Sequence, residues 1–304
     1  MRIMIAGTDI TGRYPWQDVE TDDTDGSSLD VCMLTAAGDL ASSELAQAGQ
    51  DTLMEVSEEG YTTGKMYVDA VTAKDGETTM FARGTPAKGR EKGWAAYENV
   101  TLMELVHIAA LELNMGYQQF GITDRKYGRM IRRDETQAEF LRRVLRMEGA
   151  VLKVTGGKLT AVDIAWAQQQ SAVHAFEITA STPGCLYKEE YAGYRTCTVS
   201  GMGIDGTATD TQVPGSRTLR PREITPENST QAKRWAMGEL LHKNRMSSVL
   251  MIDLDFDPKI AAMSRMDITG MKATEGAWIA NRVTQNMILR KTRVYLRRCI
   301  TTIV

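Results

Sequence analysis

Cysteine and histidine are scarce in this 304-residue chain, and neither residue type is clustered in the sequence as a disulfide framework or a metal site would require. The four cysteines are widely scattered: Cys32, Cys185, Cys197 and Cys299. A disulfide framework needs regular, closely spaced cysteines, so we expect reduced thiols and synthesis in a reducing compartment. The three histidines each stand alone in their local stretch: His107, His174 and His242. Neither H-E-x-x-H nor a Cys/His metal spacing occurs, and zinc therefore has no visible ligand set.

Long apolar runs are also missing. No stretch approaches the roughly 18 residues that a helix needs to cross a bilayer. Residues 1–7 contain too short an apolar segment for a signal peptide, so we expect no secretion by the general route. The net charge is only −3, without the basic excess that a dedicated nucleic-acid binder usually carries.

What remains is an ordinary globular composition. Hydrophobic residues make up 42% and charged residues 25%, which is typical of a folded soluble protein. On the rough prior of one domain per 150 residues, the length predicts about two domains.

Two motifs resemble ligand sites but lack the context that such sites need. Residues 201–206 match G-x-G-x-x-G after a strand-like stretch, yet residues 207–215 have no helical period to hold a pyrophosphate, and we predict a mobile loop. Asp253, Asp255 and Asp257 alternate with Leu254 and Phe256, without the glycine and glutamate of a calcium loop. That alternation predicts a half-buried strand with its acidic face in water.

Single residues likewise favour structural roles over catalysis. No G-x-S-x-G nucleophile elbow occurs. His107 lies in an apolar helical stretch and is expected to be a partly buried structural residue. His242 ends a predicted helix, where an imidazole interacts favourably with the helix dipole. The sequence thus predicts no catalytic, cofactor-binding or metal-binding residues.

The first 90 residues predict a small β domain. Short β segments near residues 29–34, 52–56, 65–71 and 78–82 are separated by Gly, Asp and Ser turns. This spacing, without a long helix, is typical of a β-barrel or sandwich. Residues 83–93 are rich in Gly, Pro and charge and predict the first boundary.

The next stretch, 91–168, predicts a helix–helix–hairpin module. Thr101 with Glu104, and Thr136 with Glu139, match the capping-box pattern that opens a helix. We expect Gly116 and Gly149 to end these helices in left-handed conformation. Residues 151–162 then predict a hairpin turning at the two glycines 156–157. The basic residues of the second helix are open to two interpretations, a ligand patch or a solvated or inter-subunit face: Arg142, Arg143 and Arg146.

The last part, 169–304, returns to β-rich sequence. Strands are predicted near residues 175–179, 194–199, 248–256, 265–269, 278–283 and 288–296, with a loose stretch over 201–221. A helix over about 226–243 is expected to open at Thr225 and Pro226. The closing segment carries six basic residues without an intervening acid, and could meet an acidic partner or nucleic acid or form a charged edge that resists aggregation: Arg282, Arg290, Lys291, Arg293, Arg297 and Arg298.

Taken in order, these residues resemble a known family. The relevant strings are Gly93-Trp94-x-x-Tyr97-Glu98, Thr101-Leu102-x-Glu104-Leu105, Gln137-x-Glu139-Phe140-Leu141-Arg142-Arg143, Glu148-Gly149-Ala150 and Gly157-Lys158-Leu159. Together they look like the tail hub proteins of contractile phages, called the late-control D or baseplate hub family. The base domains of type VI secretion spike proteins are similar.

The resemblance implies an α+β, mainly β fold in which two small β-barrels, 1–90 and 169–304, flank the insert 91–168. It implies a non-enzymatic homotrimer in the virion baseplate, assembled in the host bacterial cytoplasm. Its partners would be a spike protein, a tail tube or tube-initiator protein and baseplate wedge proteins, and the genome would pass the ring without sequence-specific binding. Since no spike segment or lytic domain is recognisable in the sequence, we expect a separate spike.

Two other classes of function remain open on the sequence. A tail-tip cell-wall hydrolase would need two acids that converge from distant positions. A carbohydrate-binding adaptor would be expected to act as a monomer. The resemblance favours the baseplate hub over both, with no cofactor.

Overall fold

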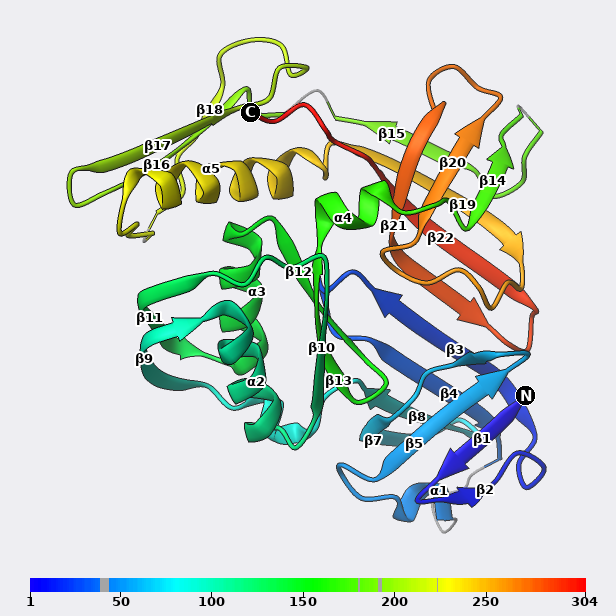
Figure 1. The fold of residues 1–304 in the computed structure, drawn as a ribbon. Helices are drawn as coiled ribbons and strands as arrows, with labels where there is room; N and C mark the ends of the chain where they lie inside the picture. The colour runs from blue at the N-terminus through cyan, green and yellow to red at the C-terminus, as the bar shows by residue number, and fades with distance from the viewer. Residues whose placement is uncertain (39–43, 180, 191–192, 223) are drawn as a thin grey trace.

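The computed structural model describes the chain except residues 39–43, 180, 191–192 and 223. It is mainly β with a few helices, and this confirms the predicted α+β, mainly β class (Figure 1). All four cysteines are free thiols, as expected. No helix in the described part of the chain has both the length and the apolarity to cross a membrane.

The N-terminal part forms one half of a large sheet. Its elements are β1 (Arg2–Ile5), β2 (Thr8–Asp9), β3 (Trp16–Thr24), β4 (Val31–Ala37), α1 (Glu44–Gln47), β5 (Leu53–Glu58), β6 (Tyr61–Thr62), β7 (Met66–Lys74) and β8 (Glu77–Arg83). The four strands predicted here are confirmed. Inward residues alternate along β4 and β8, so Cys32, Leu34 and Met80 enter one apolar core with Ile3 and Val56.

The C-terminal part supplies the other half of the sheet. Its strands are β14 (His174–Glu177), β15 (Leu186–Glu189), β19 (Ser248–Asp255), β20 (Arg265–Thr269), β21 (Gly276–Asn286) and β22 (Lys291–Arg298). A second core surrounds Trp278, which is fully buried. Strand β21 pairs antiparallel with β3, with Arg282 opposite Thr24, and this pairing joins the two halves into one sheet.

The insert lies beside this sheet. It contains η1 (Ala87–Arg90), β9 (Gly93–Thr101), α2 (Leu102–Glu112), β10 (Gly116–Phe120), β11 (Lys126–Glu135), α3 (Gln137–Met147), β12 (Ala150–Thr155), β13 (Lys158–Asp163) and α4 (Ile164–Gln169). Both capping boxes are present, and the turn glycines Gly156 and Gly157 have φ of 60° and 73°. The sequence missed β9, β10 and β11.

One predicted helix stop in the insert is wrong. Gly116 does not adopt a left-handed conformation; the residue that does so after α2 is Asn114, with φ 53°. Asparagine tolerates this conformation because its short polar side chain bonds locally. Gly116 instead begins β10, which pairs parallel with β13. The second stop is correct, since Gly149 has φ 73°.

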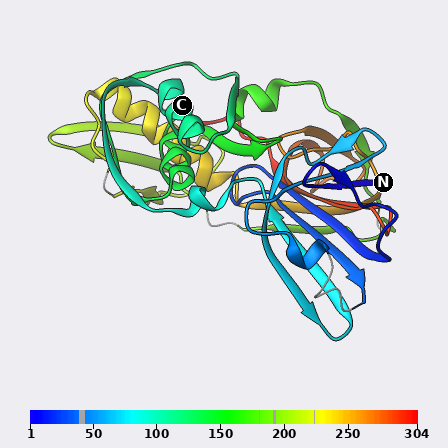
Figure 2. The ribbon, with the colours of Figure 1, turned by 90° about the horizontal axis from the view of Figure 1, so that it is seen from below.

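A further layer covers the insert. Strands β16 (Thr196–Gly201), β17 (Ile204–Thr209) and β18 (Thr218–Leu219) pack against α5 (Ser229–Asn244). Helix α5 shares one apolar core with α2 and α3, through Trp235, Phe140 and Leu105. From below, α5 and the insert helices lie at one side of the molecule and the large sheet at the other (Figure 2).

Two expectations for this layer are wrong. The stretch 201–221 is not a loose loop, because β17 occupies 204–209 and pairs with β16. Helix α5 begins after Asn228, whose side chain accepts a 2.9 Å hydrogen bond from the Gln231 amide, and not at Thr225 and Pro226. Asparagine is a stronger N-cap than threonine, which explains the later start.

Candidate functional site

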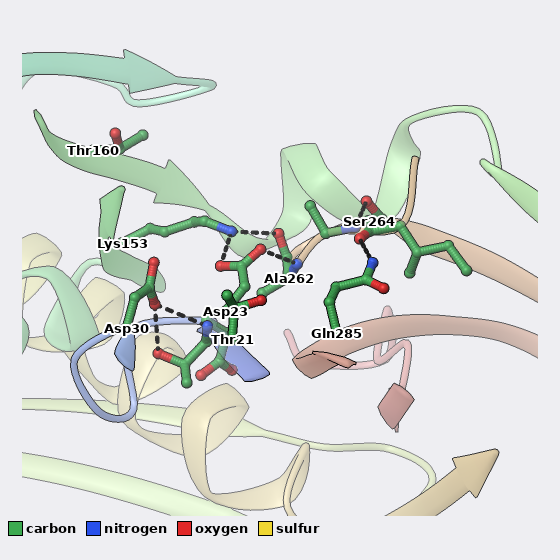
Figure 3. Close-up of polar contacts among 12 residues, drawn as sticks. Thr21, Asp23, Asp30, Lys153, Thr160, Ala262, Ser264 and Gln285 are labelled. Carbon is green, nitrogen blue, oxygen red and sulfur yellow. Dashed lines mark hydrogen bonds and ion pairs between the residues drawn. The ribbon is translucent and has the colours of Figure 1, made fainter. Parts of the chain in front are cut away.

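A buried polar cluster marks the place where the N-terminal part, the insert and the C-terminal part meet (Figure 3). Asp23 from β3 forms an ion pair with Lys153 from β12. The other Asp23 oxygen accepts a 2.8 Å hydrogen bond from the Ala262 amide, and Lys153 Nζ donates to the Ala262 carbonyl at 3.2 Å. Three distant segments are thus tied at one point, which we call the central junction.

A second acid, Asp30, lies in the same cluster and is 6% exposed. It accepts hydrogen bonds from the Thr24 amide at 2.9 Å and the Thr24 hydroxyl at 3.2 Å. Burial, and next the charge of Asp23, raise the pKa of Asp30 from its ordinary 3.8 to about 8. We therefore expect Asp30 to hold a proton at neutral pH.

The junction borders a cavity of about 330 Å³ that both acids line, together with Tyr61 and Lys153. A cavity beside an acid with raised pKa is a chemical candidate for general acid catalysis. Against that role, Asp23 is held by Lys153 and a backbone amide, and Asp30 by Thr24. The arrangement favours a structural role, in which these acids hold the three segments together. The absence of catalytic residues stays a prediction from the sequence.

Close backbone contacts reinforce the junction. Gly26 has φ +90°, and an added Cβ there would lie 2.0 Å from the Leu152 carbonyl oxygen of β12. At Gly64 a Cβ would lie 2.4 Å from the Cα of Gly156 in the hairpin turn. Only glycine permits such approaches, so loops of the N-terminal part dock directly on the β12–β13 hairpin.

Two more buried polar contacts attach α5. Arg245, at the helix end, forms an ion pair with Asp25, and both side chains are at most 4% exposed. Glu148, after α3, accepts hydrogen bonds from the Tyr127 hydroxyl at 2.9 Å, Arg234 Nε at 2.6 Å and Trp235 Nε1 at 2.7 Å. The sequence offered no signal for these partners, which lie up to 220 residues apart in numbering.

The G-x-G-x-x-G string lies in the β16–β17 hairpin. Met202 and Gly203 form its two-residue turn, with φ of 52° and 80°. Gly206 faces α5, where an added Cβ would lie 2.1 Å from the Lys233 amide nitrogen. The dinucleotide interpretation fails, as predicted, because a strand follows the motif in place of a helix.

Two acids of β19 pair with two basic residues of β22. Asp253 lies opposite Arg293 in the β19–β22 register, and Asp255 lies opposite Lys291. Arg293 Nε donates to Asp253 at 2.6 Å, and Lys291 Nζ to Asp255 at 2.8 Å. The half-buried strand predicted for 251–257 is confirmed over β19, and this stretch carries paired charges on its surface.

The histidines differ partly from expectation. His107 is exposed, not partly buried, and stacks on Tyr117 with ring centroids 4.6 Å apart. Burial, and next the positive charge of Arg146, lower the pKa of His242 to about 4. A neutral imidazole cannot provide the charge expected to interact with the helix dipole. His174 contacts Asp257. No group of three or more potential metal ligands occurs among the described residues.

The arginines of α3 do not form one surface. Arg143 binds Glu135 through two hydrogen bonds of 2.8 and 2.7 Å, and Arg146 Nε donates to Glu239 at 2.8 Å. Arg142 is half-buried, and burial lowers its pKa. Arg143 and Arg146 also border a cavity of about 380 Å³ beside α3.

No protein-family model and no curated protein sequence match this chain. Solved structures do. A 43 kDa tail protein of prophage MuSo2 from Shewanella oneidensis has a TM-score of 0.76 at 12% identity, covering 98% of this chain and 97% of that one. A tail protein from Neisseria meningitidis has a TM-score of 0.76 at 10% identity, covering 98% and 95%.

An Escherichia coli protein, described as a component of the type VI secretion system, has a TM-score of 0.61 at 9% identity, covering 97% of this chain and 76% of that one. At such identities the likeness is one of fold. The chain therefore has the fold of phage tail proteins along nearly its whole length.

Proposed function

We propose that this protein is the structural baseplate hub of a contractile phage tail or a related injection particle. In this role a homotrimer joins a threefold spike to a sixfold tail tube and nucleates tube assembly. The observation that carries the proposal is the shared fold with phage tail proteins, which covers 98% of this chain and 97% of the Shewanella protein. The function is one of assembly, without bond making or breaking.

The arrangement of the sheet supports a ring. Each chain contributes two β halves with separate cores, joined by the β21–β3 pairing. We assign the halves to two barrel units, 1–90 and 169–304, flanking the insert 91–168, so three chains would supply six units. Among the described residues, β2 and β15 end the path of the sheet, and such edges are ready to pair with another chain.

Obligate assemblies of this kind bury about 2,000 Å² or more per interface. The partners would be a spike protein, a tail tube or tube-initiator protein and wedge proteins, in a virion baseplate assembled in the host cytoplasm. The genome would pass through the ring without sequence-specific contacts.

The proposal is tested by the mass of the purified chain in solution. Light scattering should give a mass three times 33.7 kDa that persists on dilution. A monomer at every concentration and ionic strength would contradict the hub.

One observation favours a second candidate, a cell-wall hydrolase: Asp23 and Asp30 share a cavity, and the pKa of Asp30 is raised. Such an enzyme should release reducing sugars from purified cell wall. Asp30→Asn should abolish that release without loss of folding. Equal signals from both proteins, or no release, would rule out hydrolysis at this cavity.

A further inference from the structure

The cavity beside α3 collects positive charge from three separate segments. It has a volume of about 380 Å³ and lies between β11, α3 and the stretch that leads into α5. Five arginines line it: Arg129, Arg133, Arg143, Arg146 and Arg222. Glu135 is the single acid among the described lining residues, and the apolar residues Met130, Met147 and Trp235 are 6%, 2% and 3% exposed. An apolar wall thus stands behind a basic rim.

Two of the five arginines already have partners. Arg143 is bound by Glu135, and Arg146 by Glu239. The other three, Arg129, Arg133 and Arg222, are exposed and form no ion pair with a described residue, although the charge of Arg133 helps to lower the pKa of Glu135. The rim of the cavity therefore carries positive charge that no ion pair within the described part of this chain neutralises.

The edge of β11 that borders the cavity is closed to an added strand. Glu227 accepts hydrogen bonds from the amides of Gly128 at 2.8 Å and Arg129 at 3.1 Å. Arg143 donates to the Ile131 carbonyl at 2.8 Å, and Glu135 accepts from the Arg133 amide at 3.3 Å. Because these side chains occupy the backbone groups, a ligand must bind through the arginine side chains.

We propose that this cavity binds an acidic segment of a partner protein, with Asp or Glu carboxylates held by Arg129, Arg133 and Arg222. The planar guanidinium fork matches a carboxylate with two hydrogen bonds. The apolar wall lowers the local dielectric constant, which strengthens the attraction, and accommodates the methylene groups of a glutamate.

Nucleic acid fits the same cavity less well. Proteins that bind single strands stack successive bases on aromatic side chains along a groove. The one aromatic residue among the described lining is Trp235, which is 3% exposed and donates its indole N–H to Glu148. A compact cavity of this size accepts a few side chains. The proposal does not depend on the hub function, since one chain forms the whole cavity.

The test is binding of a fluorescein-labelled oligoglutamate peptide to the full chain, followed by anisotropy at low ionic strength. Loss of two charge-assisted hydrogen-bonding groups in the double variant Arg129→Gln, Arg222→Gln should raise the Kd at least about tenfold. The matched control is Arg2→Gln, Arg290→Gln, with the same change of charge at side chains 63% and 46% exposed elsewhere. The control should bind within about twofold of the wild type.

Thermal unfolding of each variant separates loss of binding from loss of folding. Three results would overturn the proposal: no binding by the wild-type chain, an equal loss in both double variants, or tighter binding of an oligothymidylate that the cavity variant abolishes. The last result would make the cavity a nucleic-acid site. The solution mass reports separately on the hub.

Discussion

Two hairpins with glycine in the turn, β12–β13 and β16–β17, have different surroundings. In β12–β13 nearly every residue is buried, and the strands lie between the N-terminal loops and α3. In β16–β17 burial alternates, because one face packs on α5 and the other carries exposed Thr and Ser side chains. A similar turn thus closes a hairpin that is buried on both faces, β12–β13, and a hairpin that is buried on one face, β16–β17. We expect side chains on buried faces to contribute more to stability than side chains on the exposed face.

The largest effect is expected at the central junction. Lys153→Met leaves the Asp23 carboxylate, which is 13% exposed, without its ion partner, and this should lower the free energy of unfolding by up to about 3–5 kcal/mol. Urea unfolding followed by tryptophan fluorescence at fixed protein concentration measures this. The control Lys291→Met removes a pair on the surface of β22 and should cause no measurable loss. Equal losses of unfolding free energy in the two variants would mean that the ion pair at the central junction stabilises the fold no more than the surface pair does.

The peripheral hairpin should be sensitive only on its inner face. Gly206→Ala puts a Cβ 2.1 Å from the backbone of α5, and such overpacking should cost about 1–3 kcal/mol. Gly203→Asn, in the turn of the same hairpin, has open space around the new Cβ, and asparagine tolerates φ +80°. We expect a smaller loss there by the same urea measurement. A larger loss at the turn than at Gly206 would contradict the packing on α5.

Stability near the central junction should also depend on pH. The pKa of Asp30 is raised on folding from 3.8 to about 8, so the folded state binds more protons between these values. Its contribution is therefore complete below pH 3.8 and is lost as the pH rises through 8. In the wild type, stability should fall as the pH rises from about 6 to about 8, the range in which the folded acid titrates. In Asp30→Asn this fall should be smaller, as measured by the urea midpoint at each pH. An unchanged slope would show that Asp30 is ionised in the folded protein.

The smallest effect is expected at the hairpin tip. Met202 is 89% exposed, so Met202→Ala removes little buried surface. The free energy of unfolding should stay within about 0.5 kcal/mol of the wild type. A clear loss of stability that depends on protein concentration would instead place this tip in a contact between chains.

Much of the fold could be predicted where the local signal is strong. The capping boxes at Thr101 and Thr136 and the glycine turn of β12–β13 specify their elements through bonds between near neighbours. Strand β17 was missed for a physical reason. Its two buried inward residues, Gly206 and Ala208, are small because α5 lies close, and Gly and Ala carry little strand propensity.

The candidate sites were harder to predict than the elements. Asp23, Asp30 and Lys153 look like solvated charges in the sequence. Only the packing of three segments brings them together, buries Asp30 and Lys153, and leaves Asp23 just 13% exposed. The arginine-lined cavity likewise combines β11, α3 and Arg222, and only two of its five arginines belonged to the basic helix face noticed in the sequence.

The sequence by itself determined the β-rich class, the two capped helices, the central hairpin and the lack of a clustered metal or disulfide motif. These depend on periodicity and on contacts within about one turn or one hairpin, which neighbouring residues encode. The tertiary structure alone decided the pairing of β3 with β21, the buried acids and the collection of arginines around one cavity. Such features depend on contacts between segments up to 268 residues apart, and no local pattern specifies them.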